Sequence, residues 1–204
     1  MSVFVTGTDT GVGKTSFSCW LLAQLRAEDV RCAGYKPICC GDRADAELLL
    51  AAGSPDLTIE QINPVWLKTP AAPLTAALAE KRELDLAALR AGFARLSEQV
   101  EFVVVEGVGG WIVPITADYF SSDLAHDLQL PVVLVAHNRL GCLNHIFLTL
   151  RGIEAARLAC AAIVLNDLGE PGDLAAESNA GILRRCLSVP VFEGFKPEML
   201  RLLL

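Results

Sequence analysis

Gly7-Thr8-Asp9-Thr10-Gly11-Val12-Gly13-Lys14-Thr15-Ser16 is the stretch that decides the fold of this chain. It follows a short apolar run at residues 3–5 and opens a helical pattern at residues 14–28. A strand, a glycine-bearing loop and a helix form a phosphate cradle, because backbone N–H groups point inward at the start of the helix. Lys14 can reach the outer phosphates of such a ligand, and the Thr15 hydroxyl can hold Mg²⁺. The stretch therefore predicts binding of a nucleoside triphosphate.

The loop is one residue longer than the standard phosphate loop. The standard form has four residues between its first glycine and the Gly-Lys-Ser/Thr ending. Here position 8 is Thr8 and the glycine lies one residue earlier, at Gly7. The alternative is a chance glycine-rich turn. The strand before the loop and the helix after it favour a phosphate site.

Composition narrows the function classes. A chain of 204 residues with 52% hydrophobic residues fits one domain, residues 1–204, with a sizeable core. The net charge of −7 argues against a nucleic-acid partner. No apolar stretch approaches the roughly 20 residues of a membrane span, and no basic segment precedes the first strand, so we expect neither a membrane protein nor a secreted one. The seven cysteines contain no CxxC pair that would suggest zinc, and reduced thiols in the cytoplasm are the simplest interpretation. The three histidines are scattered, without the spacing of metal ligands.

Short apolar runs alternate with helix-period segments. We expect strands at residues 3–5, 32–35, 102–105, 132–136, 161–165 and 189–192, and helices at residues 14–28, 44–52, 85–100, 121–128, 143–157 and 173–186. Continuously apolar runs are typical of parallel strands buried on both faces. The predicted fold is therefore α/β, with a mainly parallel sheet flanked by helices on both faces, of the P-loop NTPase type. Residues 53–73, which contain Pro55, Pro64, Pro70 and Pro73, are the least regular stretch and a candidate loop over the site.

Polar residues follow several of these strands, at the sheet edge where open parallel sheets bind ligands. Glu106 ends an apolar strand and could assist Mg²⁺, with a solvated strand end as the alternative. Asp45 could supply a second carboxylate or only cap its helix. Lys36 could neutralise a migrating phosphoryl group or be a solvated strand end. The start of the helix after Gly141 could bind an anion or be an ordinary helix start.

Several blocks together resemble the dethiobiotin synthetase family. They are, in the order of that family, residues 7–15, Gly34-Tyr35-Lys36-Pro37, Asp45-Ala46, residues 105–111 with Pro114, residues 140–145, and Asn166-Asp167. The longer phosphate loop is the form this family has. The resemblance implies an ATP- and Mg²⁺-dependent ligase of biotin biosynthesis, which joins CO₂ (or bicarbonate) to the diamino acid 7,8-diaminononanoate. A carbamate forms, its oxygen takes the γ-phosphoryl group, and the second amine closes the ring to give dethiobiotin, ADP and phosphate.

The resemblance also implies roles for individual residues. Lys36, Lys14 and Thr10 would be catalytic, and Thr15, Asp45 and Glu106 would hold Mg²⁺. Substrate would contact Lys36, the thiol of Cys40 where the family usually has a serine, and Gly141, Leu143 and Asn144 across a homodimer interface. ATP would contact these residues: Gly11, Val12, Gly13, Lys14, Thr15, Ser16, Asp45, Glu106, Gly107, Val108, Gly109, Asn166 and Asp167.

Three other classes share this nucleotide core. Partition-type and regulatory ATPases carry a lysine early in the loop, and no lysine precedes Lys14 here. A corrinoid amidotransferase would be expected to need a further glutaminase domain. A non-catalytic nucleotide-binding module would not need Lys36, Asp45 and Glu106 together. The sequence therefore favours the synthetase.

Overall fold

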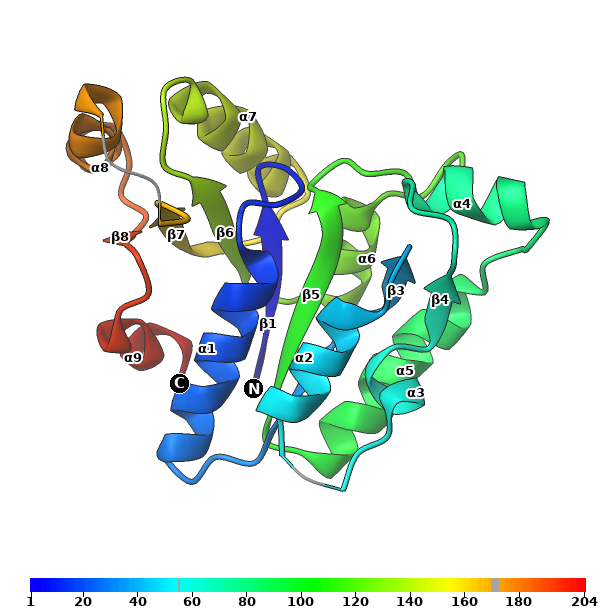
Figure 1. The fold of residues 1–204 in the computed structure, drawn as a ribbon. Helices are drawn as coiled ribbons and strands as arrows, with labels where there is room; N and C mark the ends of the chain where they lie inside the picture. Colours follow the sequence, from blue (N-terminus) through cyan, green and yellow to red (C-terminus); the bar gives the residue numbers. More distant parts are fainter. Residues whose placement is uncertain (55, 170–172) are drawn as a thin grey trace.

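The computed structural model describes residues 1–54, 56–169 and 173–204 and contains a six-stranded sheet in which every pairing is parallel. The strand order is β2-β5-β1-β6-β7-β8 (Figure 1). Four of the strands match the predicted apolar runs closely, β5 continues five residues beyond its predicted end, and the last strand begins two residues late. The strands are β1 (Ser2–Gly7), β2 (Cys32–Tyr35), β5 (Phe102–Gly110), β6 (Val132–His137), β7 (Cys160–Asn166) and β8 (Val191–Glu193).

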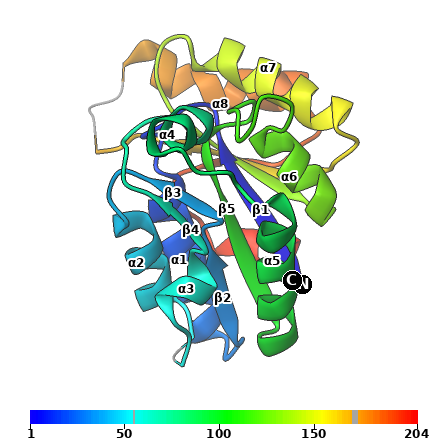
Figure 2. The ribbon, with the colours of Figure 1, turned by 90° about the vertical axis from the view of Figure 1, so that its right-hand side faces the viewer.

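Helices cover both faces of the sheet, as predicted. Figure 2 shows α1 and α2 on one side of the strands and α5, α6 and α7 on the other. The six predicted helices are α1 (Lys14–Ala27), α2 (Ala44–Ala52), α5 (Leu86–Gln99), α6 (Ser121–Leu128), α7 (Cys142–Ala155) and α8 (Leu174–Cys186). The α/β fold of the P-loop type is therefore confirmed.

The position of β1 explains why the glycine-rich loop lies at the centre of the molecule. β1 lies between β5 and β6, and residues 3–7 are buried. Residues 102–107 of β5 and 132–136 of β6 are also buried, as expected for strands covered on both faces. Because β1 and β5 are parallel and Glu106 pairs with Val5, Glu106 lies close to the phosphate loop that follows β1 at Gly7.

Residues 53–73 are more regular than predicted, although Pro55 lies outside the described residues. They contain α3 (Ile59–Ile62) and β4 (Val65–Leu67), and α4 (Pro73–Glu80) follows. β4 pairs in parallel with β3 (Ile38–Cys40) to make a separate two-stranded sheet. A 3₁₀ turn (Pro197–Met199) and α9 (Leu200–Leu203), which were not predicted either, end the chain. Apart from α4, these elements are only three or four residues long, which is too short to give a clear periodicity.

Within the described residues, none of the helices combines the length and the apolar character that a membrane span requires.

Candidate active site

Left-handed glycines shape the loop between β1 and α1. Gly11 and Gly13 have φ angles of 75° and 95°, which L side chains adopt only with strain. Gly13 is the residue that caps α1, and its carbonyl accepts the first helical hydrogen bond from the Phe17 N–H at 3.0 Å. The Lys14 ammonium is buried and donates to the Asp9 carbonyl at 3.0 Å. The loop is thereby held curved, with the start of α1 facing the cavity.

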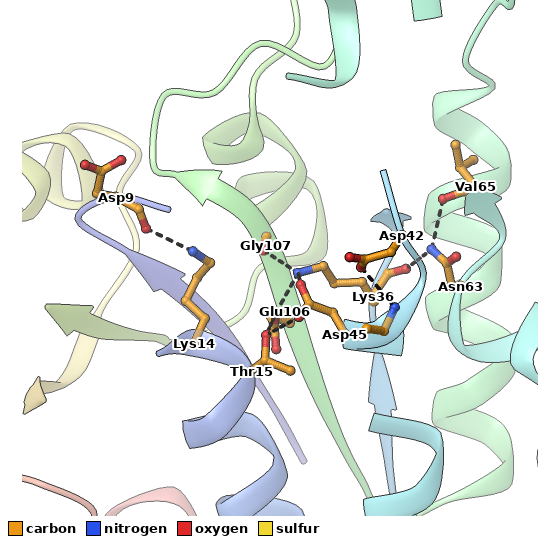
Figure 3. A network of polar contacts seen from close by, with 11 residues as sticks. Asp9, Lys14, Thr15, Lys36, Asp42, Asp45, Asn63, Val65, Glu106 and Gly107 are labelled. Carbon is orange, nitrogen blue, oxygen red and sulfur yellow. Dashed lines mark hydrogen bonds and ion pairs between the residues drawn. The ribbon is translucent and has the colours of Figure 1, made fainter. Parts of the chain in front are cut away.

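Lys36 lies at the centre of a charged network (Figure 3). Its Nζ atom is 2.6 Å from Glu106 Oε1 and 2.9 Å from Asp45 Oδ2. Glu106 is fully buried, whereas the Asp45 side chain is about half exposed. Thr15 Oγ1 lies 2.8 Å from Glu106 Oε1 and 2.9 Å from Asp45 Oδ1. Four residues from four separate segments therefore meet around Glu106. β5 continues to Gly110, so Glu106 lies within the strand and does not end it as predicted.

The two lysines have opposite pKa shifts. Burial works to lower the pKa of Lys36, but the carboxylates of Glu106 and Asp45 outweigh burial and raise it above its usual value. For Lys14, burial together with the positive charge of Lys36 lowers the pKa to about 8. Burial works to raise the pKa of Asp45, yet the Lys36 ammonium holds it below the usual value. The site thus favours the charged form of Lys36 and lowers the pKa of Lys14 to about 8.

The oxygens around Thr15 fit a magnesium ion. Mg²⁺ prefers oxygen ligands and is commonly held by one or two carboxylates together with substrate phosphates. The single hydroxyl proton of Thr15 can be donated to only one of its two carboxylate neighbours. Glu106 Oε2 is buried and has no hydrogen-bond partner among the described residues. Among the described residues, no group of three or more Cys, His, Asp or Glu side chains could hold a metal ion without other ligands. Phosphate oxygens of the nucleotide would therefore complete the coordination of the magnesium ion.

A cavity of about 770 Å³ opens in front of the phosphate loop. Most of the residues that the sequence indicated line it. These are Thr10, Gly11, Gly13, Lys14, Thr15, Ser16, Lys36, Cys40, Asp45, Val108 and Gly109.

Other indicated residues lie behind or beside the cavity. Glu106 is buried beneath Lys36, and the Gly107 carbonyl lies 3.4 Å from Lys36 Nζ. Asn166 donates to the Val12 carbonyl at 3.1 Å, so it supports the loop. Asp167 accepts from Asn138 at 2.8 Å. Gly141, Leu143 and Asn144 begin α7 and are not among the residues that line the cavity.

Sequence reasoning missed eight of the residues that line this cavity. The additional lining residues are Ile38, Cys39, Asp42, Pro70, Ala71, Ala72, Val113 and Leu168. Residues 70–72 belong to the stretch predicted to cover the site, so that prediction is right for its last part. The pairing of β3 with β4 brings them there. No local signal marks that pairing, because it joins two three-residue strands far apart in the sequence.

Solved structures show the fold class of this chain. The septum site-determining protein MinD from Pyrococcus horikoshii, complexed with Mg-ADP, has a TM-score of 0.58 at 16% identity, over 97% of this chain and 83% of that one. A nucleotide-binding protein from Archaeoglobus fulgidus, in complex with ADP, has a TM-score of 0.53 at 15% identity, over 98% of this chain and 84% of that one. At such identities the likeness shows the fold alone.

Comparison with proteins of similar sequence shows the family of this chain. A family model described as an AAA domain matches residues 1–198. A protein of Akkermansia muciniphila named ATP-dependent dethiobiotin synthetase BioD is 44% identical over 92% of this chain and 88% of its own length. Proteins of the same name from Aromatoleum aromaticum and Xanthomonas oryzae pv. oryzae are 41% and 43% identical, over 96% and 92% of this chain and 90% and 87% of theirs. The resemblance of the sequence blocks is thereby confirmed, and the chain belongs to the ATP-dependent dethiobiotin synthetase family.

Proposed function

We propose that this protein makes dethiobiotin from ATP, CO₂ and 7,8-diaminononanoate. One amine of the substrate adds to CO₂ and forms a carbamate. The carbamate oxygen attacks the γ-phosphorus of ATP, and ADP leaves. The second amine then attacks the carbonyl carbon of the mixed anhydride, the ureido ring closes and phosphate leaves.

One observation carries this proposal: Lys36 is held beside the phosphate loop by two carboxylates, at the wall of the cavity. Phosphoryl transfer needs reactants in line and compensation of the charge on the migrating group, and little covalent work from the protein. Lys14 and Lys36 supply positive charge from two sides of the cavity, and Thr10 lies on its lining. A regulatory ATPase would not need a second buried lysine at this position.

Magnesium fits the oxygens of Thr15, Asp45 and Glu106. When bound, it would neutralise phosphate charge and help to orient the triphosphate. The loop residues 11–16 and the backbone of residues 107–109 would contact the phosphates. Asn166 and Asp167, at the end of β7, would face the base.

The incubation that tests this function contains the protein, diaminononanoate, bicarbonate, Mg²⁺ and ATP, with dethiobiotin detected by mass. We expect dethiobiotin and ADP in equal amounts, and neither without the diamine. ATP hydrolysis that does not depend on the diamine, with no dethiobiotin, would refute the synthetase function.

The pKa of Lys14 predicts how nucleotide binding depends on pH. Bound phosphates favour the ammonium form, so affinity should be full below about pH 8 and fall as Lys14 loses its proton above it. We expect the Kd for ATP at pH 9 to be about tenfold higher than at pH 7. Calorimetric titration across this range measures it. Lys14→Arg should flatten the profile, because arginine stays protonated; an equally steep profile in that variant would assign the titration to another group.

A homodimer is part of the proposal. Gly141, Leu143 and Asn144 would meet the substrate carboxylate in the partner's site, and Cys40 would contact the substrate within its own. Ile112, Leu140 and Leu148 are exposed large apolar side chains near or on α7 and support an interface there. Sedimentation should give twice the chain mass, and Leu148→Glu should shift it toward the monomer. A wild-type monomer at micromolar concentration would contradict this.

We also propose a cytoplasmic location. It is supported by the seven cysteines, all of which are free thiols.

A further inference from the structure

We propose that Asn63 and Arg43 are positioning residues for the site: their hydrogen bonds fix the Lys36 backbone against the start of α2 and so set the contact between Lys36 and Asp45. The expected effect on turnover rests on the proposed function. The contacts that carry it lie outside the cavity.

The backbone of Lys36 belongs to neither sheet. It lies between the end of β2 and the start of β3. Its N–H donates to the Ile62 carbonyl at 2.8 Å, and its carbonyl accepts from Asn63 Nδ2 at 2.7 Å. Both polar groups of this backbone unit are therefore held by the end of α3. A long, flexible side chain is precise only if its backbone is fixed, so this end of α3 helps to determine where Nζ lies.

Asn63 is fully buried, and both ends of its side-chain amide are used. Nδ2 also donates to the Val65 carbonyl at 2.9 Å, as Figure 3 shows. Oδ1 accepts from Arg43 Nε at 2.9 Å, and the Asn63 carbonyl accepts from the second guanidinium nitrogen of Arg43 at 2.7 Å. Arg43 thus holds Asn63 by two contacts in the planar fork geometry that only arginine offers.

Arg43 connects Asn63 to the helix that carries Asp45. It immediately precedes α2, and its carbonyl accepts from the Glu47 N–H at 3.1 Å. Asp45 lies two residues further, in the first turn. The Arg43 guanidinium also lies 5.4 Å from the centre of the Trp66 ring. Trp66 Nε1 in turn donates to the Gly41 carbonyl at 2.9 Å. The chain on both sides of the Lys36–Asp45 ion pair is therefore bound to one buried asparagine.

The test compares two arginines of the same region. Arg43→Gln removes the contacts to Asn63. Arg82→Gln is the matched control, since Arg82 donates to the Trp66 carbonyl at 2.7 Å but contacts neither Asn63 nor Lys36. Turnover, the Mg²⁺ dependence of ADP binding by calorimetry and the melting temperature are measured for both.

For Arg43→Gln we expect kcat to fall about ten- to hundredfold with the KM for ATP changed by less than about twofold, because the phosphate loop is untouched. The Mg²⁺ concentration for half-maximal ADP binding should rise about tenfold, because Asp45 is misplaced. Arg43→Lys should recover part of both losses, and Arg82→Gln should match the wild type.

Two results would overturn the inference. One is an Arg43→Gln protein that matches Arg82→Gln in both kcat and Mg²⁺ dependence. The other is a loss of activity that follows only the unfolded fraction, with normal activity per folded molecule. If the wild type makes no dethiobiotin, the proposed function fails, and the Mg²⁺ dependence of ADP binding alone then decides whether Arg43 positions Asp45.

Discussion

Lys36→Met should abolish dethiobiotin formation and also destabilise the protein, while ATP still binds. The activity is lost because the only other cation among the described residues that line the cavity is Lys14, in the phosphate loop on the other side. The stability is lost because the fully buried Glu106 carboxyl would lose its 2.6 Å ion-pair partner. Breaking a buried pair in this way costs about 3–5 kcal/mol. At this chain length that corresponds to about 6–20 °C in melting temperature.

Two measurements separate the effects. The double variant Lys36→Met with Glu106→Gln removes both buried charges, so its melting temperature should recover while activity stays absent. In the single variant, Mg²⁺ should raise the melting temperature more than in the wild type, because it would compensate the carboxylates. Product formation by the single variant at a rate near wild type would remove Lys36 from the mechanism. An unchanged melting temperature would contradict the predicted loss of stability.

Gly13→Ala should weaken nucleotide binding far more than any change at a comparable glycine outside the loop. A Cβ at Gly13 would lie 2.1 Å from Asn166 Nδ2, which must then leave the Val12 carbonyl. Left-handed strain plus the lost hydrogen bond amounts to about 2–3 kcal/mol. In the variant without nucleotide, the phosphate loop can relax to a less strained conformation. Nucleotide binding must restore the strained conformation, so the strain energy is subtracted from the binding free energy. The Kd for ATP should therefore rise by about 30- to 150-fold.

Gly141→Ala is the matched control. Gly141 also caps a helix in the left-handed region, with φ of 90°, but a Cβ there meets nothing within 4 Å. We expect it to lower stability by only about 1–2 kcal/mol and to leave the Kd for ATP unchanged. Thermal melting and calorimetric titration of both variants test this. Equal effects of the two substitutions on the Kd would show that the contact with Asn166 is unimportant.

The strands and helices that the sequence predicted are those with strong local signals. The apolar runs of β5 and β6 are continuous and contain several valines, which is typical of strands buried on both faces, and α6 begins and ends at the predicted residues. The four-residue helix α3 has a capping box between Thr58 and Gln61, which is a local signal, but it is too short for a hydrophobic period. Pro73 at the first position of α4, followed by good helix formers, was a usable signal that the prediction did not apply.

Some residues of the candidate site could likewise be predicted from the sequence, and others could not. Lys14 and Thr15 are fixed by a contiguous motif, so the sequence places them relative to one another. Asp45 and Glu106 could be assigned to one edge because parallel strands end together. Asn63 could not be found, because its importance comes from contacts with Lys36 and Arg43, 27 and 20 residues away.

The sequence by itself determined the α/β class, the phosphate loop and the family, because each depends on short-range patterns or on blocks in a fixed order. Only the tertiary structure decided that β3 and residues 70–72 line the cavity, that Lys36 is shared by Glu106 and Asp45, and that Asn63 ties Lys36 to the start of α2. These features arise when distant segments pack together, and the pKa shifts of Lys14 and Lys36 arise with them. Burial and neighbouring charge exist only in the folded chain.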